Sequence, residues 1–204
     1  MFYDIEKTAR MLIAWLFASG AGTVTLIGAY LYAIAYPDVL YVSDFDFGVV
    51  DGTQLLAFLV FLPAALLTLR WVYRVNANAQ RLASGMSVSP GWNVGWFFVP
   101  AAHLWKPFSG VREVWAVSSD PDRWTSVSTP RALWGWWACW VVSDILGWVS
   151  LVLTWDVYGV KLVPYLPLDI VAAVISLGAT LLLIQVVRDL SRMQAGTIMR
   201  HTFA

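Results

Sequence analysis

Four long apolar runs, separated by polar segments, dominate the pattern of hydrophobic and polar residues along this chain. They predict membrane-spanning helices over residues 11–36, 52–73, 132–155 and 162–187. Each run supplies the roughly 20 residues that a helix needs to cross the hydrocarbon core of a bilayer. The sequence therefore predicts an all-α integral membrane protein with four transmembrane helices in a single membrane domain, residues 1–204.

Small residues recur at every fourth position within these runs, which predicts close packing between helices. In lipid, spanning helices gain little from hiding apolar surface, so small side chains that let two backbones approach favour their association. The positions in the first and third runs are Ala14, Ala18, Gly22, Gly135, Cys139, Ser143 and Gly147.

A shorter apolar stretch lies between the second and third runs and differs from all four. Residues 92–105 are 14 residues before the charge of Lys106, which is too few to span a bilayer. Pro100 and Pro107 also lack the backbone N–H that a straight helix requires. We expect residues 89–117 to form a broken helical segment that either re-enters the membrane or lies along its surface.

The basic residues predict how the chain is oriented. Twelve of the 13 lysines and arginines precede the first predicted span, lie between the second and third, or follow the fourth. Only Lys161 lies in one of the two opposite loops. Because basic residues collect on the cytoplasmic side, we expect both termini in the cytoplasm and the protein in the bacterial cytoplasmic (inner) membrane.

Composition agrees with a chain exposed to lipid and excludes several functions. Charged residues make up 13% of the chain, about half the roughly 25% that is typical of soluble domains. The formal net charge of zero provides no basic field for nucleic acid. The single cysteine, Cys139, excludes an internal disulfide, and the 13 tryptophans make the chain tryptophan-rich.

Four short motifs in the middle of the chain resemble a known family. In order, they are RWVYRVNANAQRL, SPGWNVGWFFVP, HLWKP and REVW. Together they are similar to a family of small bacterial membrane proteins catalogued as domain of unknown function four-three-two-eight, over residues 55–190. The resemblance implies a multispanning membrane protein and supplies no assigned reaction. One departure is His103, where the family pattern has asparagine.

Asp144 is the candidate for chemistry inside the membrane, because it lies near the middle of the third predicted span. A carboxylate at that depth costs roughly 3 kcal/mol on insertion scales, so it requires a partner, a proton or water. One interpretation makes it a proton relay or a counter-charge for an ion or ligand. The alternative is a structural bond, with Lys106, Arg112, Thr25, Ser176 and Thr180 as the candidate partners.

Basic and aromatic residues in and near the central segment are the candidate binding residues. The planar guanidinium group of arginine can bind two phosphate oxygens at once, so one interpretation of the basic residues is a site for anionic lipid headgroups. The alternative is that they only set the topology and extend toward the interface. The tryptophans either line a pocket for a lipid or isoprenoid or belong to interfacial belts. His103 is expected to form hydrogen bonds. The candidates are Arg70, Arg74, His103, Lys106, Arg112, Trp92, Trp96, Trp105, Trp137 and Trp140.

Motifs for catalysis, metals and cofactors are missing from the sequence. It contains no HExxH, no GxSxG and no phosphate-binding glycine loop. The aspartates of residues 37–51 lack the order of an EF-hand, and His103 and His201 are the only histidines. We therefore expect no metal and no cofactor.

These observations favour a non-enzymatic binding or accessory protein that engages lipid or another membrane protein through residues 89–115. A small transporter or channel that uses Asp144 is the alternative hypothesis, and a membrane enzyme acting on a lipid is the third. The expected partners are membrane lipids and either another membrane protein or further copies of this chain. Nucleic acid is not expected as a partner.

Overall fold

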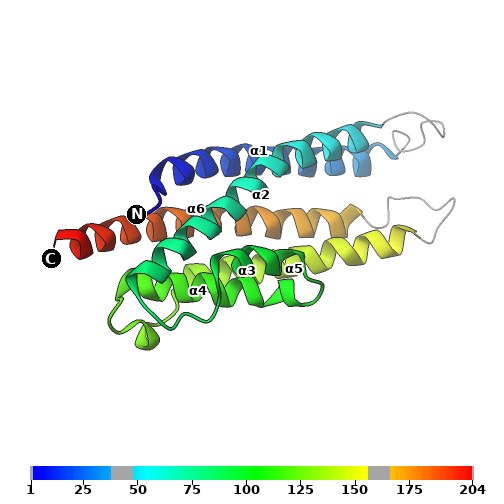
Figure 1. Cartoon of the computed structure of the whole chain (residues 1–204). Coiled ribbons are helices and arrows are strands. Elements are labelled where there is room, and N and C mark those ends of the chain that lie inside the picture. Colours follow the sequence, from blue (N-terminus) through cyan, green and yellow to red (C-terminus); the bar gives the residue numbers. More distant parts are fainter. Residues whose placement is uncertain (1, 38–47, 156–165, 204) are drawn as a thin grey trace. The chain divides into compact units, whose positions relative to one another are not determined.

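Four long helices account for most of the chain in the computed structural model, which describes residues 2–37, 48–155 and 166–203 (Figure 1). They are α1 (Glu6–Ala35), α2 (Val49–Leu82), α5 (Arg131–Trp155) and α6 (Leu166–Phe203). Each contains an 18-residue window apolar enough to cross a membrane. The described residues contain no strand, so the predicted all-α fold with four candidate transmembrane helices is confirmed.

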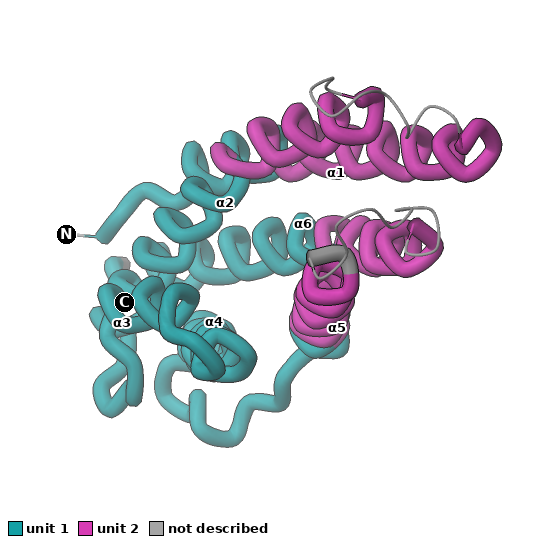
Figure 2. Tube along the Cα trace, turned by 90° about the vertical axis from the view of Figure 1, so that its right-hand side faces the viewer, with its two compact units in different colours: residues 1–14, 64–134, 182–204 teal, residues 15–63, 135–181 magenta. Residues whose placement is uncertain are grey.

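The chain divides into two compact units, which Figure 2 shows in different colours. Unit 1 consists of residues 1–14, 64–134 and 182–204, and unit 2 consists of residues 15–63 and 135–181. Each of the four long helices contributes residues to both units. The whole segment between α2 and α5 belongs to unit 1.

Small residues bring the helices of unit 2 close together, as their spacing predicts. A Cβ placed on Gly22 of α1 would lie 3.6 Å from the Cα of Ala57 on α2. A Cβ placed on Gly178 of α6 would lie 4.0 Å from the Sγ of Cys139 on α5. Both are ordinary van der Waals distances, so small residues lie where these helices meet, and side chains larger than alanine would have little room there.

Large apolar side chains remain exposed along unit 2, as expected for helices that face lipid. More than half of the side-chain surface is accessible at each of the most exposed positions, although soluble proteins rarely show such extended apolar surface. These positions include Phe17, Val24, Leu31, Leu56, Phe58, Trp148, Val152 and Leu181.

Helix α2 continues beyond the apolar run that predicted it. The predicted span ends at residue 73, whereas the helix continues through a polar stretch to Leu82. The reason is that this part of the helix is buried in unit 1, with Val75, Asn76 and Asn78 fully inaccessible to solvent. Tertiary packing of this face outweighs its polar composition.

The C-terminal residues that follow the fourth predicted span are also helical. Helix α6 extends to Phe203, and its last turns bury Gln194 and Thr197 in unit 1. The ring of His201 meets the ring of Phe2 edge-on, with 6.5 Å between their centroids. The tail is therefore part of the folded unit.

The central segment is a series of short helices, and its predicted interruption lies at Pro100. Helix α3 (Pro90–Gly95) and η2 (Trp96–Phe98) precede the interruption, and η3 (Ala102–Leu104) follows it. Ala101 has φ of 61°, a strained conformation for a residue with a side chain. Helix α4 (Lys106–Ser119) then begins with Pro107 in its first turn, where proline is tolerated because its missing N–H would have no helical partner.

Candidate functional site

A network of buried amides and hydroxyls holds the elements of unit 1 together. Gln194 of α6 donates through Nε2 to the carbonyl of Val75 at 2.9 Å and to the Oγ of Ser118 at 3.0 Å. Its Oε1 accepts from the Nδ2 of Asn78 at 3.3 Å. The hydroxyl of Thr197 donates to the Ser118 carbonyl at 2.7 Å. Helices α2, α4 and α6 are therefore joined by bonds whose members are all buried.

The first residues of the chain are attached to α2 by backbone and side-chain bonds. The amide of Tyr3 donates to the Oδ1 of Asn78 at 2.7 Å, and the Asn78 Nδ2 donates to the Tyr3 carbonyl at 3.0 Å. The Nη1 of Arg74 donates to the Asp4 carbonyl at 3.1 Å and to the Thr8 hydroxyl at 2.6 Å. These contacts fix the beginning of α1 beside α2 within unit 1.

Helix α3 packs on α4 through an unusual pair, Asn93 and Gly110. Asn93 is fully buried, and neither its Oδ1 nor its Nδ2 has a hydrogen-bond partner within the described residues. A Cβ placed on Gly110 would lie 2.6 Å from the Asn93 Cγ and 2.9 Å from its Nδ2. A side chain at residue 110 would therefore force Asn93 to move, so glycine lets the two helices approach this closely.

A pocket of about 330 Å³ lies between the segment after α2 and the start of α4. Its lining residues, which we call the lysine pocket, are Ser87, Val88, Ser89, Trp92, Trp96 and Lys106. The Nζ of Lys106 lies 5.5 Å from the centroid of the Trp96 ring, within cation–π range. The Trp92 and Trp96 rings lie 4.8 Å apart. The pocket thus combines one cation, two indoles and two hydroxyl groups.

Glu113 of α4 holds one wall of the lysine pocket. Its Oε2 accepts from the backbone amide of Ser87 at 2.9 Å, and its Oε1 accepts a short bond from the Ser87 hydroxyl. Ser89 caps α3 by accepting from the amide of Trp92 at 3.4 Å. The cap and the carboxylate therefore order the loop that carries the pocket.

Three aromatic side chains of the central segment point away from the packed interior of unit 1. Trp92 is 57% exposed, Phe98 is 71% exposed and Trp105 is 51% exposed. Trp92 also lines the lysine pocket. The pocket therefore adjoins apolar surface that would be poorly accommodated in water.

The structure separates the basic residues that the sequence analysis grouped together. Arg70 and Arg74 line a second pocket of about 460 Å³, whereas Lys106 lines the lysine pocket. Arg112 is exposed on α4 and lines neither. We call the second pocket the N-terminal pocket, and its lining residues are Asp4, Lys7, Thr8, Met11, Leu67, Arg70 and Arg74.

The predicted residues on α5 belong to unit 2 and not to the unit that holds these pockets. Trp137 is buried and Trp140 is half-buried, with 4.8 Å between their rings. Asp144 is half-buried one turn further along the helix. Of its proposed hydroxyl partners, Thr25 and Thr180 donate to carbonyls of their own helices, Ala21 and Ser176 respectively. Residue His103 is half-buried in η3 of unit 1.

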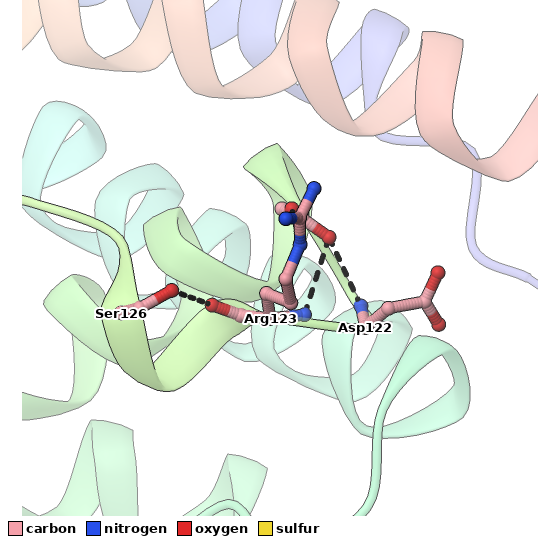
Figure 3. A network of polar contacts seen from close by, with 4 residues as sticks. Asp122, Arg123 and Ser126 are labelled. Carbon is pink, nitrogen blue, oxygen red and sulfur yellow. Dashed lines mark hydrogen bonds and ion pairs between the residues drawn. The ribbon is translucent and has the colours of Figure 1, made fainter.

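The connector between α4 and α5 is ordered by one carboxylate, as Figure 3 shows. The Oδ1 of Asp120 accepts from the amides of Asp122 and Arg123, both at 3.2 Å. The Oδ2 of Asp120 lies 3.4 Å from the Nε of Arg123, and the Ser126 hydroxyl donates to the Arg123 carbonyl at 2.8 Å. This polar connector therefore has a defined turn.

Sequence reasoning missed the N-terminal pocket and the buried network. The signal for the network was the pattern NANAQ, which places amides at alternate positions beside small alanines. Among the described residues, no group of three or more His, Cys, Asp or Glu side chains is arranged to hold a metal ion.

One comparison with known proteins gives a match. The model of a family described as "Domain of unknown function (DUF4328)" matches residues 37–192, which include α2 to α5 and most of α6. No curated protein and no solved structure matches the chain.

Proposed function

Because the chain belongs to the DUF4328 family, whose description assigns no activity, we propose a function from the site alone: a non-enzymatic membrane protein that binds lipid through residues 89–115. The observation that carries the proposal is the lysine pocket, which exposed Trp92 lines, in a segment that also exposes Phe98 and Trp105. Lys106 supplies a positive charge for a lipid phosphate, and the hydroxyl of Ser89, which accepts from the Trp92 amide, can donate a further hydrogen bond.

Exposed aromatic residues support an interfacial position for this segment. Tryptophan is favoured at the boundary between headgroups and acyl chains because its indole is apolar and carries one N–H donor. Phe98 has no polar atom on its side chain, so its 71% exposure favours contact with acyl chains. The interruption at Pro100 separates Phe98, the last residue of η2, from Trp105, which follows η3 and precedes α4.

We propose that the protein lies in the bacterial cytoplasmic membrane with both termini in the cytoplasm. The distribution of basic residues supports this orientation, since 12 of 13 fall on the side of the termini. Single cysteines at Asp51 and Ser126, in a Cys139→Ala background, test the orientation. An impermeant reagent added to cells should label position 51 and not position 126, and the reverse pattern would refute it.

Contact between the central segment and lipid is tested with a fluorophore on a single cysteine. Phe98→Cys and Ser126→Cys, each in the Cys139→Ala background, carry an environment-sensitive dye in lipid nanodiscs. The dye at residue 98 should emit at shorter wavelength and be quenched by brominated acyl chains, whereas the dye at the exposed connector should not. Equal quenching at both positions would exclude the proposal.

Headgroup binding is tested by comparing Lys106→Gln with Arg112→Gln. Both variants remove one positive charge from α4, but only Lys106 lines the lysine pocket. We expect Lys106→Gln to retain fewer anionic lipids in native mass spectrometry, with Arg112→Gln close to wild type. Equal retention by the two variants would remove Lys106 from the site.

A further inference from the structure

The N-terminal pocket collects hydrogen-bond donors that the protein itself does not use. Lys7 of α1 and Arg70 of α2 both line it, and both are exposed. Neither side chain forms a hydrogen bond or an ion pair within the described residues. Arg74 binds the Asp4 carbonyl and Thr8 through Nη1, which leaves its other N–H groups available.

The charge of the pocket favours an anion. Three cationic side chains and one carboxylate, that of Asp4, line it. The Oδ1 of Asp4 accepts from the backbone amide of Glu6 at 3.0 Å, so this carboxylate is already bound at the beginning of α1. A ligand therefore meets a net positive lining, and the hydroxyl of buried Thr8 can donate to it because it accepts from Arg74.

The pocket lies where both of its helices change from charged to apolar sequence. On α1, Lys7 and Arg10 precede Met11, the first residue of an uncharged run. On α2, Leu67 belongs to the uncharged run that ends at Arg70. Met11 and Leu67 form the apolar part of the lining. In a spanning protein this boundary lies at the depth of lipid phosphates.

We propose that the N-terminal pocket is a second binding site, distinct from the lysine pocket, that takes the phosphate group of an anionic ligand. Lys7 and Arg70 bind the phosphate oxygens, and Arg74 is held in position by Thr8 and Asp4. Arginine forks match phosphate geometry and form charge-assisted bonds stronger than neutral ones. The phosphate belongs either to a membrane lipid headgroup or to a soluble phosphate.

Two double variants with the same change of charge test the site. Lys7→Gln/Arg70→Gln removes both uncommitted cations, and Arg10→Gln/Arg192→Gln removes two exposed cations that do not line the pocket. Binding of full-length protein in nanodiscs is measured with phosphatidylglycerol and phosphatidylcholine, and with inorganic phosphate in detergent. The first variant should bind the anionic probe about tenfold more weakly, while the second stays near wild type. Equal losses would overturn the proposal.

The source of the phosphate follows from which probe responds. Loss confined to phosphatidylglycerol identifies a lipid headgroup, and loss with inorganic phosphate identifies a soluble phosphate. Both results support the site. An unchanged affinity for both probes in the Lys7→Gln/Arg70→Gln variant would exclude it.

Acylation of lysines in the wild-type protein gives a readout that does not depend on the variants. An amine-reactive reagent modifies Lys7 in the N-terminal pocket and Lys106 in the lysine pocket, and peptide mass spectrometry separates them. Protection of Lys7 by the anionic probe supports this site, whether or not Lys106 is protected. Protection of Lys106 alone would overturn this inference and leave the lipid-binding proposal standing.

Discussion

The side chain of Asn93 lies directly against the backbone of Gly110, in the place that a larger residue at 110 would need. A Cβ on Gly110 would lie 2.6 Å from the Asn93 Cγ, closer than side-chain carbons approach one another. Asn93 is fully buried, and its side-chain amide has no hydrogen-bond partner within the described residues. The contact is therefore one of shape, and it fixes α3 on α4.

Replacement of Gly110 by alanine should destabilise unit 1 by about 1–3 kcal/mol, because Asn93 must move within a packed interior. Glycine to alanine changes inside helices otherwise stabilise proteins, by roughly 0.5–1 kcal/mol. Gly196→Ala on α6 is the matched control, since nothing lies within 4 Å of a Cβ there. Thermal unfolding in detergent measures both. An unchanged melting temperature in Gly110→Ala would show that α3 is not held by this contact.

The same contact predicts that a second substitution rescues the first. In Asn93→Ala/Gly110→Ala, the small side chain at residue 93 makes room for the new methyl group. Asn93→Ala removes a buried side-chain amide that has no hydrogen-bond partner. The loss of packing in this variant is partly offset, because the desolvation penalty of that amide is removed as well. The double variant should be more stable than Gly110→Ala alone. Additive losses in this double-mutant cycle would contradict direct contact.

The long apolar helices were predictable because their signal is local. Uncharged runs of sufficient length leave few alternatives to a spanning helix. The fold class therefore followed from the four long apolar runs, of which residues 11–36 are the first. The interruption in the central segment was predictable for the same reason, since Pro100 cannot donate to a helix. Small residues such as Gly22 likewise indicated a packing face, and a Cβ there meets Ala57.

The parts that could not be predicted depend on contacts between distant residues. Gln194 meets Asn78 across 116 positions of sequence. The amides of NANAQ do not show by themselves which distant residues will bury them. Arg70 and Arg74 appeared to belong with Lys106 because all three are basic and near the same interface. They line another pocket because the chain before α1 attaches to α2 through Tyr3.

Replacing Gln194 by methionine should destabilise unit 1 by about 3 kcal/mol, because several buried polar groups lose a partner at once. Methionine has a similar length, so the effect reports lost hydrogen bonds more than lost volume. The groups affected are the Val75 carbonyl, the Ser118 hydroxyl and the Asn78 amide. Gln185→Met on the exposed side of the same helix is the control. Equal melting temperatures for the two variants would show that the network contributes little.

In the connector after α4, the Asp120 carboxylate accepts hydrogen bonds from two backbone amides and forms an ion pair with Arg123 (Figure 3). We expect the two hydrogen bonds to contribute more to stability than the ion pair. Asp120→Ala removes the acceptor for two amides and should cost about 1 kcal/mol. Arg123→Gln removes an ion pair whose arginine is 82% exposed, and many such exposed pairs contribute nothing measurable, others about 0.2–1 kcal/mol. Denaturation of both variants at low and high salt measures the difference. A larger loss in Arg123→Gln would reverse this order.

Leucine at Gly22 should separate α1 from α2 in unit 2, because the space beside residue 22 ends at Ala57. A Cβ on Gly22 would lie 3.6 Å from the Ala57 Cα, which is ordinary contact, so Gly22→Ala should be tolerated. The additional carbons of leucine have no such space, and overpacking typically costs about 1–3 kcal/mol. Gly28→Leu is the control on the same helix, since nothing lies within 4 Å of a Cβ there.

Melting temperatures in detergent, with cysteine crosslinking across the α1–α2 contact, measure the separation. We expect Gly22→Leu to melt at lower temperature and to crosslink more slowly than Gly28→Leu, while Gly22→Ala stays near wild type. Both leucine substitutions add the same apolar surface to the same helix, and in lipid such surface contributes little to stability. A difference between the two variants therefore reports the steric fit of the side chain beside Ala57. If both leucine variants melt alike, the approach of α1 to α2 does not depend on the small residue at position 22.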